Sequence, residues 1–177
     1  DARVTTSAAA SVRLATVEDA DAIARVHLAS HREAYVATGR IPSEVVEAWT
    51  LALRQASQRD HLTRQAAGTP EQTFVAEVGG DVVGFSVAGP SHDDDREGGW
   101  ELYAIYLLEA QHGTGLGQAL LEAALGERAA SLWVLAENPR AHAFYTRNGF
   151  FADGAEKVDP QWGNVPEVRL VRTAQSE

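Results

Sequence analysis

The alternation of strand-like and helix-like segments most constrains what this chain can fold into. Strand character is found at 11–15, 73–78, 82–89, 100–108, 131–136, 149–157 and 166–172. Helical spacing of apolar residues is found between them, at 16–35, 43–66, 115–130 and 139–148. Since the connections are short, we expect the helices to pack directly onto a sheet. The 177 residues suffice for one ordinary domain. The pattern therefore predicts a single layered domain of the α/β or α+β class.

Three local signals fix where elements begin or turn. Thr16 followed by Asp19 is typical of a capping box at a helix start. Ser43 follows a proline and predicts the start of a second helix. Gly79 and Gly80 lie between two strand segments, and glycine accepts the positive φ of a tight turn. We therefore expect a β-hairpin around residues 79–80.

Composition excludes several classes of protein. A formal net charge of -10 argues against nucleic acid or a membrane surface as a partner, and no apolar run approaches the roughly 20 residues that span a bilayer. The absence of cysteine excludes disulfides and a thiolate nucleophile and fits a reducing, cytoplasmic location. We expect a disordered leader or cloning remnant at 1–10, the domain at 11–173 and a tail at 174–177.

A glycine-rich turn in residues 107–125, LLEAQHGTGLGQALLEAAL, joins a strand to a helix. Backbone amides at a helix start, freed by glycine for close approach, are typical of a phosphate site. A dinucleotide fingerprint would need glycine where Gln118 or Leu120 stands, and the lysine of a P-loop is missing. A G-x-G-x-G turn remains. The alternative is a glycine turn that binds no ligand.

A second pattern, ENPRAHAFYTRNGF, occupies residues 137–150. Asn138 stands at a helix start, Pro139 at its first position and Gly149 at its end. Tyr145 follows Asn138 by two helical turns, so both lie on one face of the helix.

Together these two segments resemble the GNAT superfamily of acetyl-CoA-dependent N-acetyltransferases, from about Ser11 to Val171. The family signature Q/R-x-x-G-x-G/A falls on 112–117, with His112 in place of Gln or Arg, and Glu109 stands where proline is frequent. The resemblance implies a mixed, mostly antiparallel sheet of six to seven strands with about four helices. It also implies acetyl-CoA contacts from His112 and from the backbone amides of Gly113, Gly115, Leu116, Gly117 and Gln118.

Catalytic roles follow from the same resemblance. An alkylammonium must lose a proton before it attacks a thioester, and the family's general base falls on Glu101. Strand alternation would place it on one sheet face with Tyr103, Ile105 and Leu107, with a water relaying the proton over about 13 Å unless a bulge shortens the path. Tyr145 would protonate the departing sulfur. The alternatives are a solvated glutamate at a strand start and a core tyrosine.

Two further contacts are implied for the acetyl group and its arm. A backbone amide near Leu107, where paired strands separate, would stabilise the oxyanion. Asn138 would hydrogen-bond the pantetheine arm, and it fits equally well as an ordinary helix N-cap. By the same resemblance, 31–35 and 159–164 flank the acceptor. The acidic run 91–95 is expected to point into solvent, and no metal site is expected.

The predicted activity is acetyl transfer from acetyl-CoA to a primary amine by direct attack in a ternary complex, because no cysteine can carry an acetyl group. A small-molecule acceptor is favoured. A protein or peptide acceptor, and a CoA-binding regulatory module without turnover, remain as alternatives. A homodimer is left open.

Overall fold

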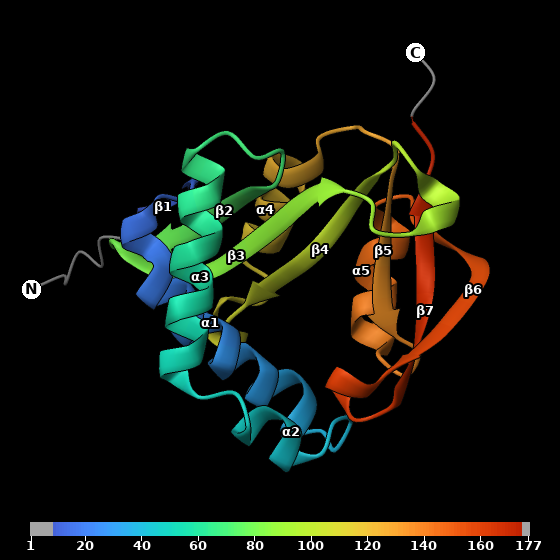
Figure 1. Cartoon of the computed structure of the whole chain (residues 1–177), viewed down its shortest axis with the longest axis horizontal. Coiled ribbons are helices and arrows are strands. Elements are labelled where there is room, and N and C mark those ends of the chain that lie inside the picture. Colours follow the sequence, from blue (N-terminus) through green and yellow to red (C-terminus); the bar gives the residue numbers. More distant parts are fainter. Residues whose placement is uncertain (1–8, 175–177) are drawn as a thin grey trace, which may run out of the picture.

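The computed structural model describes residues 9–174, in which seven strands form one mixed sheet in the order β1-β2-β3-β4-β5-β7-β6 (Figure 1). Their bounds are β1 Ala10–Leu14, β2 Gln72–Val78, β3 Asp81–Pro90, β4 Trp100–Leu107, β5 Ala130–Leu135, β6 Phe151–Asp159 and β7 Val165–Arg172. β4 and β5 are parallel and the other neighbouring strands are antiparallel. The mostly antiparallel sheet predicted from the sequence is confirmed. Residues 1–8 of the expected leader and 175–177 of the expected tail lie outside the described residues.

Helices cover both faces of the sheet. The α-helices are α1 Ala20–His31, α2 Ser43–Glu47, α3 Leu51–Ala66, α4 Leu116–Leu125 and α5 Pro139–Arg147. In Figure 1, α3 lies in front of the first strands and α4 behind them. Ile23 and Leu62 pack with Phe85 of β3 on the front face, whereas Leu120 of α4 packs with Ala76 and Val83 on the back face. None of the helices in residues 9–174 is long and apolar enough to cross a membrane.

The prediction of one helix over 43–66 is wrong. α2 ends at Glu47, and α3 begins only at Leu51. Thr50 between them has an extended backbone, and its hydroxyl accepts the amide of Leu53 at 3.2 Å. The extended backbone of Thr50 prevents α2 from continuing, and the hydrogen bond from its side chain caps the start of α3. The split gives five α-helices in place of the four expected.

The first helical segment and the hairpin follow the sequence more closely. The capping box of Thr16 and Asp19 is present, although it opens a short 3-10 turn (Val17–Asp19) before α1. After α1 the chain continues as one π-helical stretch, Arg32–Val36. β2 and β3 form the predicted hairpin, with φ of 62° at Gly79 and 90° at Gly80.

The parallel strands β4 and β5 separate soon after they meet. Glu101 pairs with Ser131 and Leu102 with Leu132, and the register extends no further. Figure 1 shows the two strands together at one end and diverging toward the other. The divergence leaves backbone groups of β4 without a neighbouring strand. The separation expected near Leu107 is thus present.

The alternation predicted along β4 is wrong, because the strand contains a bulge. The register with β3 shifts between Val87 and Ala88, which makes Tyr103 an extra residue on β4. A bulge reverses which face the following side chains occupy. Leu102 packs in the core beneath α4, so its neighbour Glu101 points to the opposite face. The four residues expected on one face therefore divide between two: Glu101 and Tyr103 on the α1 side, and Ile105 and Leu107 on the α4 side.

Candidate functional site

A cavity of about 1030 Å³ is lined by both diverging strands and by α4, α5, the π-helical stretch after α1 and the turn between β6 and β7. Nine of the ten site residues named from the sequence line it: Glu101, Leu107, His112, Gly113, Gly115, Gly117, Gln118, Asn138 and Tyr145. Leu116 does not line the cavity, because its side chain is buried between α4, which it begins, and the back of the sheet. Its backbone amide still belongs to the first turn of α4.

The glycine turn brings free backbone amides to the cavity. Gly113 and Gly115 have φ of 78° and 89°, values that favour glycine. The amide of Ala119 donates to the carbonyl of Gly115 at 3.0 Å, so the amides of residues 116–118 precede the first bond of α4. A Cβ at Gly113 or Gly115 would meet nothing within 4 Å. The turn therefore leaves room beside a set of donors suited to an anion.

Leu107 presents its backbone to the space between β4 and β5. The amide of Leu108 donates to Val83 of β3 at 3.0 Å. Successive residues of a strand direct their amides to opposite sides, so the amide of Leu107 points away from β3. Its carbonyl lies 2.9 Å from Nε2 of His112. The Leu107 amide thus has the placement that an oxyanion donor needs.

His112 is turned inward by this hydrogen bond. Its Nε2 donates to Leu107, and its Nδ1 is buried without a hydrogen-bond partner. The imidazole lines the cavity from beneath the glycine turn. Its contact with a diphosphate stays a prediction, and its bond to Leu107 adds a role that the sequence did not indicate.

α5 carries Asn138 and Tyr145 to the cavity wall opposite β4. Asn138 is the N-cap, and its Oδ1 lies 3.4 Å from the amide of Ala141. Tyr145 is 9% exposed and packs against Phe150 at a centroid distance of 5.9 Å. Burial, with a smaller contribution from Tyr35, raises the pKa of Tyr145 far above its usual value. Its hydroxyl keeps its proton at neutral pH, as an acid must.

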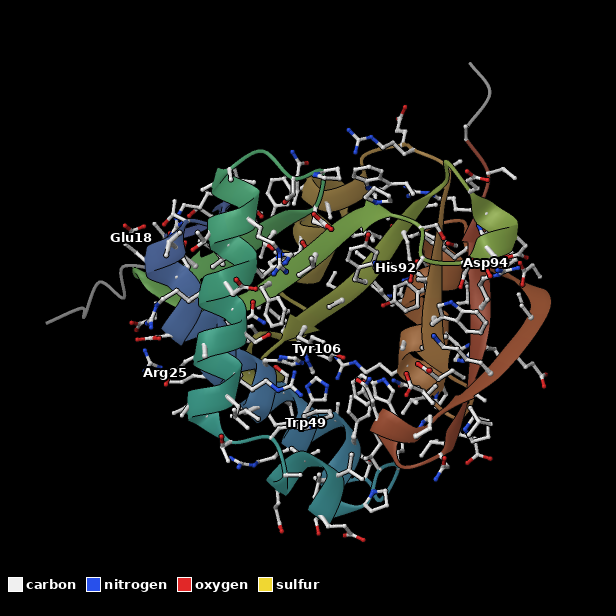
Figure 2. The ribbon with its side chains drawn as sticks, in the orientation of Figure 1. Glu18, Arg25, Trp49, His92, Asp94 and Tyr106 are labelled. Atoms are coloured by element: carbon white, nitrogen blue, oxygen red, sulfur yellow. The ribbon has the colours of Figure 1, made fainter. Side chains whose placement is uncertain are left out.

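Glu101 is held at the end where β4 and β5 still pair. The residue is 7% exposed, and its carboxylate accepts the backbone amide of His92 at 2.9 Å and the hydroxyl of Ser91 at 3.3 Å. The ring of His92 stacks on Tyr103 at 4.5 Å. These contacts come from the loop after β3, which Figure 2 shows with His92 labelled. They fix the orientation of a carboxylate that borders the cavity.

The same loop is fastened by Arg169 of β7. The guanidinium, with its side chain 8% exposed, contacts Asp93 at 3.1 Å, Asp95 at 2.6 Å and Asp153 at 2.8 Å. Asp93 also accepts the indole N–H of Trp133 at 3.1 Å. The expectation that the acidic run points into solvent is therefore wrong for Asp93, whose side chain is 18% exposed, because a charge buried on the sheet attracts it. Asp95 pairs with the same guanidinium, but its side chain is 65% exposed. Within residues 9–174, no group of three His, Asp or Glu side chains is arranged to hold a metal.

We call the wall formed by residues 107, 112, 113, 115, 117, 118, 138 and 145 the glycine-turn half of the cavity. The other wall, which we call the aromatic half, consists of Tyr35, Tyr106, Trp162 and Glu167. His31 and Trp49 lie behind it. The ring centroid of Trp162 lies 5.1 Å from that of His31 and 5.3 Å from that of Trp49. In Figure 2 Trp49 and Tyr106 lie on the side of α1 and α2. Both predicted flanking segments, 31–35 and 159–164, contribute to this half.

Two histidines of α1 support the aromatic half in neutral form. His31 is fully buried, and burial lowers its pKa to about 4. Burial, together with the charges of His31 and Arg54, lowers the pKa of His27 to about 2. Nδ1 of His31 lies 2.7 Å from the carbonyl of His27. The pair therefore carries no charge at neutral pH and packs like an aromatic residue.

Sequence reasoning missed Glu167 and two arginines of the cavity wall. Glu167 lies on β7 and is 7% exposed. Arg140 and Arg147, seven residues apart on α5, line the glycine-turn half at its exposed rim. The spacing of the arginines, two turns like that of Asn138 and Tyr145, was a usable signal. Glu167 had none, because nothing in its local sequence distinguishes it from an exposed strand residue.

A parallel pair of strands that separates around a cavity, with helix amides on one wall and a buried glutamate and tyrosine beside it, defines an acyl-transfer fold of the N-acetyltransferase type. The comparisons agree. The family model described as Acetyltransferase (GNAT) family matches residues 40–150, and the chain belongs to this family. It is an acetyltransferase enzyme.

Relatives and solved structures support the same assignment. The chain is 32% identical over 136 residues to the uncharacterized N-acetyltransferase YuaI of Bacillus subtilis, covering 73% of each protein. Its fold is similar to that of the PaiA N-acetyltransferase of Thermoplasma acidophilum, which was solved in complex with coenzyme A. The TM-score is 0.74 at 18% identity, and the comparison covers 93% of this chain and 99% of the PaiA chain. The fold is also similar to that of an N-acetyltransferase of Staphylococcus aureus Mu50, with a TM-score of 0.68 and 20% identity. This comparison covers 94% of this chain and 99% of the other.

Proposed function

We propose that this enzyme transfers the acetyl group of acetyl-CoA to a primary amine on a small molecule, by direct attack while both substrates are bound. The observation that carries the proposal is one cavity that joins the glycine-turn amides, Glu101 and Tyr145. The coenzyme A complex of the Thermoplasma PaiA protein supports acetyl-CoA as the donor. The absence of cysteine supports direct attack, because a covalent acetyl-cysteine cannot form.

The glycine-turn half is suited to hold the donor. The amides of 113 and 115–118 would bind the diphosphate, and the arginines 140 and 147 would add positive charge at the rim. Because both arginines are exposed, each contributes on the order of 1 kcal/mol or less. Asn138 would meet the pantetheine arm with the part of its amide that the N-cap leaves free. Leu107 would direct its amide at the thioester oxygen.

The reaction removes two protons from the acceptor ammonium and adds one to the departing sulfur. The amine nitrogen forms a bond to the thioester carbon, and the carbon–sulfur bond breaks. One nitrogen proton passes to Glu101 through water and from there to solvent. Tyr145 gives its proton to the departing sulfur and regains one from the nitrogen. Burial raises the pKa of Tyr145, so its hydroxyl holds a proton when the reaction begins.

A small acceptor is favoured by the way the aromatic half is closed. Trp162, in the turn between β6 and β7, stacks on His31 of α1 at 5.1 Å and 11°. A Cβ at the neighbouring Gly163 would lie 3.1 Å from Val45 and 3.2 Å from Pro42. The turn and the α2 region are therefore in tight contact (Figure 1). An extended polypeptide would need an open groove at this place.

The test measures free thiol release from acetyl-CoA with a panel of small primary amines and, in parallel, a peptide library. We expect turnover with small amines, and much lower turnover for the Tyr145→Phe protein. Preferential turnover of peptides would favour a polypeptide acceptor. Tight binding of acetyl-CoA with no thiol release from any acceptor would favour a regulatory module. Product inhibition patterns that fit a ping-pong scheme would contradict direct attack.

A further inference from the structure

Glu167 is a buried carboxylate on the cavity wall, and one of its oxygens has no hydrogen-bond donor. The residue is 7% exposed and lines the aromatic half. Its Oε2 is buried and makes no hydrogen bond. The nearest cation is Lys157, whose Nζ lies 3.8 Å from Oε2, beyond hydrogen-bond distance. A buried carboxylate costs free energy unless it is paired and hydrogen-bonded, so this oxygen lacks the donor that its position requires.

Lys157 does not supply that donor. Its ammonium lies 4.3 Å from the ring centroid of Trp133, and its side chain is 41% exposed. Burial raises the pKa of Glu167. The charge of Lys157 lowers this pKa, and the charge of Asp159 raises it further. The side chain of Lys157 therefore shares its charge between an aromatic ring, water and one carboxylate oxygen. It leaves Glu167 incompletely compensated.

Aromatic residues line the same part of the cavity as Glu167. Tyr35 and Tyr106 are close enough that the charge of Glu167 contributes to raising the pKa of both. Trp162 lines the same wall, with its ring 6.0 Å from that of Tyr35. A carboxylate among aromatic faces is a favourable environment for an alkylammonium ion, which gains an ion pair and cation–π contacts at once. The net charge of -10 would also attract a cationic acceptor.

Resting on the proposed acetyl transfer, we propose that Glu167 binds a second ammonium group of the acceptor, so that the preferred acceptors are alkyl diamines and longer polyamines. The acceptor would be held at one nitrogen by Glu167 and would present its other nitrogen to the thioester. A monoamine of equal length would leave the free oxygen of Glu167 unpaired. The aromatic half would therefore select for charge as well as for size.

The sheet register sets the length of such an acceptor. Glu101 lies opposite Ser131 on β5, and Glu167 lies opposite Leu135. Four residues of strand separate these positions, about 13 Å, and two strand spacings add about 10 Å across the sheet. The two carboxylates thus approach the cavity from its two ends. A nitrogen placed between them for reaction leaves space for several methylene groups before Glu167.

The test compares straight-chain diamines with monoamines of the same chain length. Thiol release gives kcat and KM for each, with wild type, Glu167→Gln, Glu167→Asp and Lys157→Met. The Glu156→Gln protein, changed at an exposed glutamate of β6 outside the cavity, is the matched charge control. Binding of the diamines in the presence of CoA is measured by calorimetry, which gives a readout independent of turnover.

We expect wild type to prefer diamines, and Glu167→Gln to lose about 10- to 100-fold in kcat/KM for diamines, through KM, as expected for a charged hydrogen bond. Monoamines should change less than about threefold in a subsite of this kind. Glu167→Asp should shift the optimum to a longer diamine, because its carboxylate is withdrawn by one methylene. Lys157→Met should lower KM for diamines by a few-fold, since it removes a competing cation.

The outcomes separate the subsite from the reaction. If wild type uses diamines and monoamines equally, or if Glu167→Gln lowers kcat for both alike, the cation subsite is refuted while acetyl transfer stands. If no amine releases thiol but diamines bind to wild type and not to Glu167→Gln, the subsite stands and the proposed function fails. Diamine binding that is the same in both proteins refutes the subsite whatever the turnover.

Discussion

The two halves of the cavity differ in how their residues are distributed along the chain. The glycine-turn half takes most of its residues from two contiguous stretches, 107–118 and 138–145. The aromatic half draws on the π-helical stretch after α1, on β4, on the turn at Trp162 and on β7. The first binds through backbone amides at a helix start, which a short segment can supply alone. The second depends on side chains that only the packed domain brings together, so remote changes should disturb it.

The largest effect is expected at the chemical step, which uses Tyr145 of the glycine-turn half and Glu101 at the end where β4 and β5 pair. Tyr145→Phe should lower kcat by about 100-fold or more and leave KM for acetyl-CoA nearly unchanged, because the hydroxyl acts mainly as sulfur departs. Glu101→Gln should remove the acidic limb of the pH profile of kcat/KM. Steady-state kinetics between pH 5.5 and about 9 measure both. Wild-type turnover in either variant would contradict the catalytic role of the residue that was changed.

Acidification should weaken the aromatic half before the glycine-turn half. The pKa of His31 falls from 6.5 in the unfolded chain to about 4 in the fold, and that of His27 to about 2. The unfolded chain then binds more protons below pH 6.5, so stability is full above pH 6.5 and is lost as pH falls toward 4. His31 alone would contribute about 3 kcal/mol over this range.

Urea unfolding at pH 7 and at about pH 4.5 measures this loss. The His31→Phe protein should show a shallower dependence on pH, because the titrating group is gone. Glu167 acts in the opposite direction, since its raised pKa stabilises the fold on acidification. Equal slopes for wild type and His31→Phe would show that the buried histidine does not set acid stability.

A single glycine should suffice to damage the other half. Gly115→Leu places a side chain in open space beside the helix amides, at a φ of 89°. We expect affinity for acetyl-CoA to fall by about 100-fold, as the loss of amide contacts to an anion implies. Gly154→Leu is the matched control, because Gly154 has a φ of 92° and equally open surroundings but lies on β6 away from the cavity.

Calorimetric titration with acetyl-CoA compares the two proteins. Both variants carry similar backbone strain, so a loss confined to Gly115→Leu reports on the binding site. Should both lose affinity equally, strain alone would be the cause. Unchanged affinity in a folded Gly115→Leu protein would remove the assignment of the glycine turn.

A smaller effect is expected from Arg169, which lies outside both halves. Arg169 holds Asp93, whose amide donates to Ser91 at 3.2 Å, and Ser91 in turn contacts Glu101. Arg169→Met should release this loop and lower kcat about tenfold, with a shifted acidic limb of the pH profile, because the carboxylate of Glu101 loses its fixed orientation. Arg169→Lys should restore part of the rate. A stability loss with an unshifted profile would make Arg169 purely structural.

The smallest effect is expected at His112. If the imidazole contacts the diphosphate, His112→Gln should weaken the binding of acetyl-CoA by a few-fold, since a single polar contact to an anion contributes on the order of 1 kcal/mol. The bond to Leu107 predicts a different result: His112→Gln should lower kcat by a few-fold and leave Kd for acetyl-CoA unchanged. Dissociation constants and kcat for both proteins decide between the two roles.

Much of the fold and of the donor site could be predicted because their signals are local. Gly79 and Gly80 predicted the hairpin through their φ preference, and the glycine turn with Asn138 and Tyr145 followed from spacing on one helix. Of the two errors, one missed a local signal, because Thr50 caps a second helix through the amide of Leu53. The other arose where a neighbour in space overrides the pattern, since Tyr103 bulges out of register with β3.

The sequence by itself determined the class of domain and the glycine turn, because helix starts, turns and strand periodicity depend on residues a few positions apart. The acid–base pair was named through the resemblance to the GNAT superfamily and stays a prediction. The tertiary structure alone decided which carboxylates meet the cavity. Register between β5 and β7 turns Glu167 inward, and Arg169 on the same face draws Asp93 out of solvent. Such placements depend on pairing between strands far apart in sequence, and a shift of one residue would move each side chain to the opposite face.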